Sequence, residues 1–72
     1  MSVARVTELS ATSQSSFEDA IQEGINRATS TLRGVEGAWV KDMNVLIENG
    51  SIVGYKVNMA ITFVLEDSQS AG

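Results

Sequence analysis

Large apolar residues alternate with small or polar residues over the last third of the chain. The large apolar positions are Val53, Tyr55, Val57, Met59, Ile61, Phe63 and Leu65. The positions between them are mostly polar or small: Gly54, Lys56, Asn58, Ala60 and Thr62. A period of two residues is typical of a strand with one buried face. We therefore predict a long strand over Ile52 to Leu65, whose odd-numbered positions cover a helix.

An apolar spacing of three and four residues earlier in the chain predicts one amphipathic helix. Its apolar positions are Phe17, Ala20, Ile21, Ile25, Ala28 and Leu32. Ser15 and Ser16 each stand three residues before an acid, a spacing that satisfies the free amide groups at a helix N-terminus. Arg33 in the expected last turn and Gly34 just beyond it suit a helix C-terminus. The apolar face of this helix should pack on a sheet.

The segment before the helix carries two weaker signals. Val3 to Ser10 mixes valine and leucine with charged and hydroxyl residues, which is typical of a short strand. Ser10 to Ser16 is rich in hydroxyl side chains, which hydrogen-bond to nearby backbone groups and favour turns and helix caps. We expect the first strand to end near Ser10, with a loop between it and the helix.

The segment between the helix and the last strand changes the parity of its apolar positions. These residues are Ala38 and Val40 at even positions, then Met43, Val45 and Ile47 at odd positions. A bulge residue inserted near Lys41 or Asp42 would bring all of them to the face that packs on the helix. Trp39 would then lie on the other face, whereas without a bulge it would be a core residue. The pair Asn49-Gly50 predicts a two-residue hairpin turn into the last strand.

Composition removes several classes of function. The chain has no cysteine and no histidine, which excludes disulfides, thiolate zinc sites and nucleophiles paired with histidine. We expect no catalytic residues, no metal-site residues and no enzymatic activity. A net charge of -4 disfavours a nucleic-acid partner. With no signal peptide pattern and no apolar run near ~20 residues, we expect a cytoplasmic protein without a membrane partner.

The length of the chain bears on its assembly. A 72-residue domain buries only roughly 60% of the surface that its unfolded chain exposes, so it is marginal on its own. Without cysteine, the remaining source of added stability is oligomerisation. The even-numbered face of the last strand is neutral enough to meet another subunit, although a solvent-exposed face is the alternative.

Several local strings occur in an order and spacing that resemble the dodecin family of small flavin-binding proteins. They are Arg5-Val6-Thr7-Glu8, Thr12-Ser13, Ala20-Ile21, Arg27-Ala28, Thr31-Leu32-Arg33, Ile47-Glu48-Asn49-Gly50 and Thr62-Phe63-Val64-Leu65-Glu66-Asp67. The resemblance spans residues 3 to 67 without a gap. It implies an α+β fold of β-α-β-β order, with a three-stranded antiparallel sheet wrapped around one amphipathic helix. Residues 1–67 would form a single dodecin-like domain, and residues 68–72 a flexible C-terminal tail.

The resemblance also implies a function and a ligand site. Twelve copies would form a hollow homododecamer that stores or buffers a flavin, FMN or riboflavin, between subunits and without catalysis. In flavin-binding members a tryptophan stacks on the flavin and a glutamine binds its polar edge. Those positions are Gly37 and Lys56 here, and Asn44 occupies the position of an arginine common in the second strand. Trp39 would project from the same side as Gly37, so the candidate cofactor-binding residues are Gly37, Trp39, Asn44 and Lys56.

Two alternatives stand beside this interpretation. Trp39 could pack across a subunit interface, where tryptophan is enriched, with Lys56 a solvated charge. The shell could also have lost flavin binding and bind metal ions, anions or another small molecule instead. Oxygen ligands for a hard cation would come from Asp42, Glu48, Glu66 and Asp67. Because no loop has a calcium-binding spacing, we interpret these four residues as surface acids.

Overall fold

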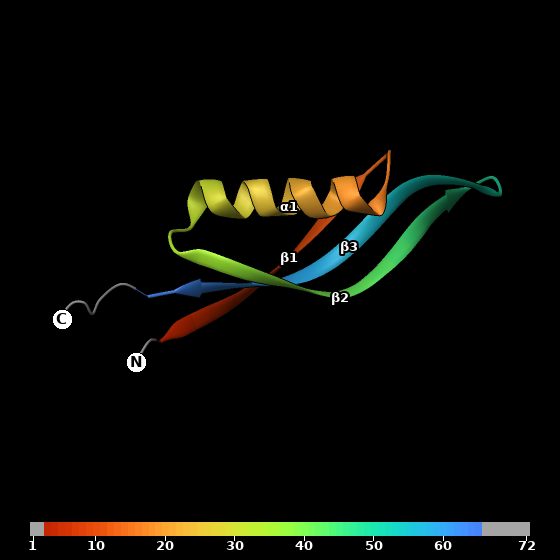
Figure 1. Ribbon diagram of the computed structural model, residues 1–72. Coiled ribbons are helices and arrows are strands. Elements are labelled where there is room, and N and C mark those ends of the chain that lie inside the picture. Colours follow the sequence, from red (N-terminus) through yellow and green to blue (C-terminus); the bar gives the residue numbers. More distant parts are fainter. Residues whose placement is uncertain (1–2, 66–72) are drawn as a thin grey trace.

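One helix packs on one face of a three-stranded sheet in the computed structural model, which describes residues 3–65 (Figure 1). The elements are β1 (Ala4–Ser13), α1 (Phe17–Thr31), β2 (Val35–Glu48) and β3 (Ser51–Val64). The sheet is antiparallel with strand order β1-β3-β2, so the last strand of the chain lies in the middle. The predicted β-α-β-β order and fold class are confirmed. The tail expected over residues 68–72 lies outside the described residues.

Of the two serines that the sequence singled out, Ser16 caps the N-terminus of α1. The Ser16 hydroxyl accepts a hydrogen bond from the Asp19 backbone N–H at 3.0 Å. The Ser13 hydroxyl accepts the Ser15 backbone N–H at 2.9 Å and donates to the Asp19 carboxylate at 2.7 Å. The bond from Asp19 satisfies an amide group that a helix leaves free in its first turn, and the bonds of Ser13 fix the segment that leads into the helix.

The C-terminus of α1 comes earlier than predicted. The helix ends at Thr31 with Leu32 as its cap, so Arg33 lies beyond the last turn, which contains no basic residue. The Leu32 backbone N–H still donates to the Ala28 carbonyl oxygen at 2.8 Å. Gly34 has a φ of 71°, the left-handed conformation expected of it, and it turns the chain into β2.

Strand β1 ends three residues later than expected. The hydroxyl-rich residues after Ser10 were expected to form a loop, but the strand continues to Ser13, which pairs with Tyr55 of β3. Pairing with the central strand supplies backbone hydrogen bonds along this whole segment, and this tertiary contact outweighs the local preference for a turn. The connection to α1 is therefore short.

The predicted bulge and the predicted hairpin turn are both present. The pairing register of β2 shifts between Val40 and Asp42, which leaves Lys41 as the extra residue. Trp39 consequently pairs with Ala60, on the face of the sheet away from α1. Asn49 and Gly50 have φ values of 50° and 79°, as a two-residue turn with both central residues left-handed requires.

The core lies between α1 and the middle of β3. It consists of the buried residues Ala20, Ala28, Val57, Met59 and Ile61, with Leu9, Ala11, Phe17, Ile21, Leu32, Val35 and Val40 packed around them. Gly24 of α1 lies so close to β3 that a Cβ atom there would overlap the Met59 methyl group. The absence of a side chain at Gly24 thus lets the helix approach the sheet.

The hairpin of β2 and β3 extends past the N-terminal end of α1 (Figure 1). Leu46, Ile47, Ile52 and Val53 are exposed there. Met43 is exposed as well, although it pairs with the buried residue Val57. The prediction that Met43, Ile47 and Val53 pack on the helix is therefore wrong. Their parity is consistent with the pattern, but a helix of 15 residues is too short to reach Ile47 and Val53 on strands of 14 residues each. Met43 is exposed because it lies on the edge strand β2, which α1 contacts least.

Candidate ligand-binding face

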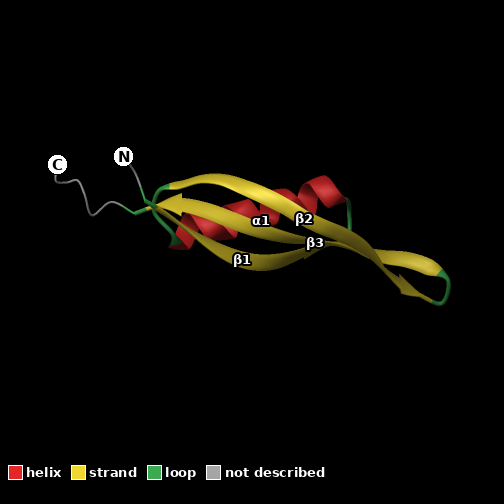
Figure 2. Ribbon diagram, turned by 90° about the horizontal axis from the view of Figure 1, so that it is seen from below, coloured by secondary structure: helices red, strands yellow, loops and turns green. Residues whose placement is uncertain are grey.

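The sheet has a second face, opposite α1, which we call the outer face; it is the face turned to the reader in Figure 2. Residues directly paired in an antiparallel sheet project to the same side, so the register defines the outer face as four rows across β1, β3 and β2. The rows are Val6-Thr62-Gly37, Glu8-Ala60-Trp39, Ser10-Asn58-Asp42 and Thr12-Lys56-Asn44. All four sequence-predicted site residues therefore lie on the outer face.

The four site residues do not meet within one chain. Thr62, the partner of Gly37, and Lys56, the partner of Asn44, stand six positions apart along β3, which corresponds to ~20 Å. The row of Trp39 is about 13 Å from the row of Lys56 by the same rise per residue. The structure brings the residues to one face, as two pairs at opposite ends of it.

Between these pairs runs a row of hydrogen-bonded polar side chains. Asn58 of β3 donates from Nδ2 to Asp42 Oδ1 of β2 at 2.6 Å. On its other side, Asn58 accepts a hydrogen bond from the Ser10 hydroxyl of β1. The row crosses all three strands and gives the Asp42 carboxylate a protein partner.

An ion pair crosses the sheet at the neighbouring row, Glu8-Ala60-Trp39. Lys41 Nζ lies 2.7 Å from Glu8 Oε2, and so the bulge residue of β2 reaches a side chain of β1. The hydrogen bond to Glu8, followed by the charge of Glu8, raises the pKa of Lys41 above its ordinary value of 10.5. The pair spans β3 at the level of Ala60, whose side chain is only 5% exposed although it belongs to the outer face. Sequence reasoning missed this pair, because its partners are 33 residues apart.

Lys56 differs from Lys41 in its surroundings. Its side chain is half-buried, and its neighbours in the row are the neutral residues Thr12 and Asn44. Within residues 3–65, no carboxylate pairs with Lys56. The positive charge of Lys56 is thus uncompensated on this face.

Trp39 and Gly37 form an open end of the outer face. Trp39, the largest side chain in the four rows of the outer face, is 67% exposed. A Cβ atom built on Gly37 would meet no other atom within 4 Å. An exposed ring beside an open backbone can stack on a flat ligand or pack against another chain.

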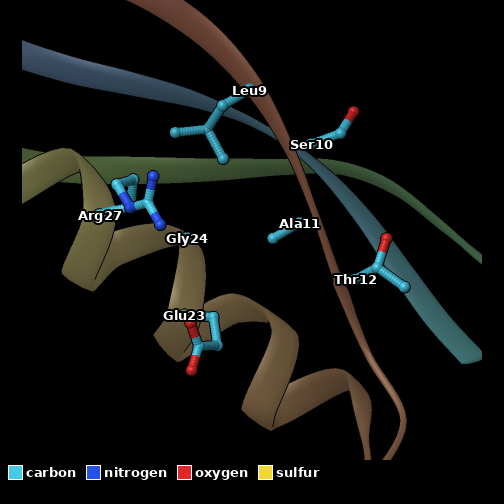
Figure 3. A pocket seen from close by; sticks show the side chains of 7 residues that line it. All are labelled: Leu9, Ser10, Ala11, Thr12, Glu23, Gly24 and Arg27. Atoms are coloured by element: carbon cyan, nitrogen blue, oxygen red, sulfur yellow. The ribbon is translucent and has the colours of Figure 1, made fainter.

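A groove lies elsewhere, between β1 and α1 (Figure 3). Its volume is about 300 Å³, and it is lined by Leu9, Ser10, Ala11, Thr12, Glu23, Gly24 and Arg27. In Figure 3, Leu9 and Ala11 point from β1 toward α1, whereas Ser10 and Thr12 point to the other side of the strand. The groove contains none of the predicted site residues and combines one acid with one base.

The acids among the described residues are scattered, and the one helix that these residues form is short. Within the part of the chain that the structure describes, no three acids, cysteines or histidines lie together as a metal site would need. Glu66 and Asp67, two of the acids considered as oxygen ligands, lie outside that part. No helix among the described residues is long and apolar enough to cross a membrane.

The β-α-β-β fold and the local sequence strings noted above both match one known family. The model of the Dodecin family matches residues 3–66. This chain belongs to the dodecin family. The predicted family is therefore confirmed, and dodecins are small non-catalytic binding proteins.

Several dodecins are similar to this chain. The calcium dodecin of Mycobacterium tuberculosis is 25% identical over 69 residues, which cover 96% of this chain and 97% of the relative. A crystal structure of a Thermus thermophilus dodecin variant superimposes with a TM-score of 0.87 at 33% identity, over 93% of this chain and 100% of that one. The Streptomyces coelicolor dodecin gives a TM-score of 0.87 at 31% identity, over 93% and 96% of the two chains.

Two findings from these dodecins concern binding and assembly. The crystal structure of the calcium dodecin from M. tuberculosis matches with a TM-score of 0.78 at 26% identity, over 93% of this chain and 96% of that one, and is described as having a novel calcium-binding site. Dodecin-fold homologues are oligomeric.

Proposed function

We propose that this dodecin is a non-catalytic cytoplasmic protein that stores or buffers a flavin, FMN or riboflavin, on the outer face of its sheet. The observation that carries the proposal is the exposed ring of Trp39 beside the open position Gly37. Stacking on an aromatic plane is the contact that a flat isoalloxazine ring needs most. Lys56 and Asn44, on the same face, offer hydrogen-bond donors to the polar groups of the ligand.

The site is completed by a neighbouring subunit of a homododecamer. One chain offers a single aromatic plane on an open sheet, whereas binding sites for small molecules enclose most of the ligand surface. A second subunit facing the outer face would close the site and supply a second plane. The exposed apolar residues of the hairpin support assembly as well, because a chain of this size rarely exposes so many.

A second function is favoured by the calcium dodecin among the relatives. In that alternative the shell binds a cation, an anion or another small molecule and no flavin. The outer face holds a carboxylate in Asp42, with the amide of Asn58 beside it at 2.6 Å. Both side chains can offer oxygen ligands to calcium, and further ligands would have to come from other subunits.

Titration of riboflavin and FMN tests the first proposal. Binding should quench the flavin fluorescence and also the emission of Trp39, which is the single tryptophan of the chain. No quenching at micromolar protein would overturn flavin binding. Isothermal calorimetry with calcium, in the absence of flavin, tests the alternative in the same preparation.

Light scattering tests the assembly. A homododecamer has twelve times the monomer mass of 7.7 kDa, and a particle near the monomer mass would refute the shell. The variant Trp39→Ala should lose flavin affinity and keep the particle size. Unchanged flavin affinity with a smaller particle would show that Trp39 belongs to a subunit interface instead.

A further inference from the structure

We propose that Asn49 is a site of spontaneous covalent modification, at which attack by the backbone nitrogen of Gly50 converts the side-chain amide to aspartate or isoaspartate. The only other reactant is one water molecule. The isoaspartate product does not fit the turn between β2 and β3, so the modification opens the exposed end of the hairpin. The site needs neither a ligand nor the outer face of the sheet.

The sequence distinguishes Asn49 from the other asparagines of the chain. Asn49 is the one asparagine that a glycine follows, and a glycine has no side chain to shield its backbone nitrogen. The others lie inside α1, β2 and β3, where regular structure holds the main chain, whereas Asn49 lies between two strands. They are Asn26, Asn44 and Asn58, followed by arginine, valine and methionine.

The surroundings of the turn leave the reacting atoms open to solvent. Asn49 and Gly50 are both exposed, and the turn lies beyond the N-terminal end of α1 (Figure 1). A Cβ atom built on Gly50 would meet no atom within 4 Å, so no distant residue of the described chain crowds this position. Water therefore has free access to both steps of the reaction.

The reaction balances without any further reagent. The Gly50 nitrogen bonds to Cγ of Asn49, the Cγ–Nδ2 bond breaks, and Nδ2 leaves as ammonia with the proton of Gly50. The product is a five-membered succinimide ring. Water then adds its hydroxyl to one of the two ring carbonyl carbons and returns a proton to the Gly50 nitrogen. Opening at Cγ gives aspartate, whereas opening at the backbone carbonyl carbon of Asn49 gives isoaspartate.

The turn itself restrains the first step. Asn49 has a φ of 50°, and in a two-residue turn of this kind its ψ is about 30°. With that ψ the Gly50 nitrogen and Cβ of Asn49 lie on opposite sides of the Cα–C bond. A five-membered ring needs them on the same side. The turn must therefore open before the nitrogen can reach Cγ.

Opening of the turn should require little free energy. The apolar residues next to it, Ile47 and Ile52, are exposed, so burial of their side chains within the subunit does not hold the strands together. The pairing register also shifts between Leu46 and Ile47. Local opening is easiest where few buried contacts hold the chain. The folded protein should therefore react slowly, and at this turn before any other asparagine.

Isoaspartate changes the length of the turn. Its main chain passes through Cβ and Cγ, which adds one carbon atom between residues 49 and 50. Glu48 and Ser51 pair directly across the present turn, and the length of a hairpin turn fixes the pairing register. The pair Glu48–Ser51 should therefore be lost on conversion, while pairs closer to α1 persist.

Peptide mass spectrometry of the purified full-length protein, stored at mildly alkaline pH, tests the site. Asn49 should gain the mass that replacement of an amide by a carboxylate brings, and electron-transfer fragmentation distinguishes isoaspartate from aspartate. Asn26, Asn44 and Asn58 are internal controls and should stay unchanged. In urea, conversion at Asn49 should be at least about tenfold faster, because the turn no longer restrains it.

Two outcomes of this experiment would overturn the proposal. One is an unchanged Asn49 in the folded protein over a time in which the protein in urea is converted. The other is equal conversion at all four asparagines of the folded protein, because the turn would then have no special role.

The matched variant is Asn49→Gly, because a Gly-Gly pair fits the same turn and has no side-chain amide. Hydrogen exchange at the backbone amides of Glu48 and Ser51, measured before and after storage, gives the second readout. Exchange should become faster in the stored wild-type protein and stay constant in Asn49→Gly. Unchanged exchange in chains that carry isoaspartate, or an equal rise in the variant, would contradict opening of the hairpin by this modification.

Discussion

Lys41 and Glu8 lie on the two edge strands of the sheet, yet their side chains meet at 2.7 Å across the central strand. The bulge at Lys41 makes this possible, because the extra residue adds its side chain to the outer face beside Trp39. The ion pair removes one acid and one base from the charge available to a ligand.

Replacing Glu8 by glutamine should lower the pKa of Lys41 toward its ordinary value of 10.5, because the hydrogen bond to the carboxylate and its charge are what raise it. The raised pKa belongs to the folded state. The pair therefore stabilises the fold fully below pH 10.5, and the contribution is lost as pH rises through the raised pKa. The effect on stability should be small, since both side chains are solvent-exposed.

NMR titration of the lysine side chains measures that pKa directly. The control is Glu36→Gln, which removes an exposed acid of β2 that has no ion pair in the described residues. The Lys41 pKa should stay raised in this control. An equal fall in both variants would mean that net charge, rather than Glu8, sets the pKa.

Gly34→Ala should destabilise the fold by about 1–3 kcal/mol. Gly34 has a φ of 71°, and an added Cβ would lie 2.8 Å from the Val64 carbonyl oxygen, so both the backbone and the contact oppose a side chain. Urea unfolding at fixed protein concentration measures the change in the free energy of unfolding.

Gly37→Ala is the control for that prediction. A Cβ on Gly37 meets nothing within 4 Å, and its φ is not positive, so the free energy of unfolding should change by less than about 0.5 kcal/mol. Comparable losses in the two variants would contradict the assignment of the strain to Gly34.

Gly37→Trp should raise flavin affinity by about tenfold, because it adds an aromatic plane at the open end of the outer face. The measurement is the same flavin titration that tests the proposed function. Val6→Trp, in the same row on β1, adds the same ring at the far edge of the sheet and should bring a smaller gain. An equal gain in both variants would indicate non-specific stacking.

Ile47→Asp should reduce the particle to a smaller species in light scattering. Ile47 is 63% exposed on the part of the hairpin that extends past α1, so a charge there should not disturb the core of the subunit. Burial of the new carboxylate in a subunit contact would be costly. The control is Ser51→Asp, close to the hairpin turn, which should leave the particle intact. An unchanged particle in Ile47→Asp would exclude Ile47 from the assembly contacts.

Local patterns in the sequence predicted the order of the elements, the hairpin turn and the bulge. The change of parity after Val40 left two positions open for Trp39, and the register shift between Val40 and Asp42 places it on the face away from α1. Features that depend on long-range contact were missed. Strand β1 runs on to Ser13 because β3 pairs with it, and the end of α1 leaves Ile47 exposed although its parity is that of a core residue.

The candidate site could be predicted only in part for the same reason. The resemblance placed Gly37, Trp39, Asn44 and Lys56 together, and the register shows that they share a face without forming one cluster. The ion pair of Glu8 with Lys41 leaves Lys56 as the lysine of the outer face without a carboxylate partner among the described residues, and this ion pair follows from the pairing of strands that are distant in sequence.

The bulge at Lys41 means that the length of β2, rather than the identity of its residues, determines which side chains face a ligand. Deleting that one residue would rotate the preceding segment of β2 by half a turn, moving Trp39 toward α1 and Val40 to the outer face. The same change in β3 would turn the core residues Val57, Met59 and Ile61 to the outer face and so disrupt the fold. A single insertion or deletion in an edge strand could thus give a new ligand specificity to an otherwise unchanged shell.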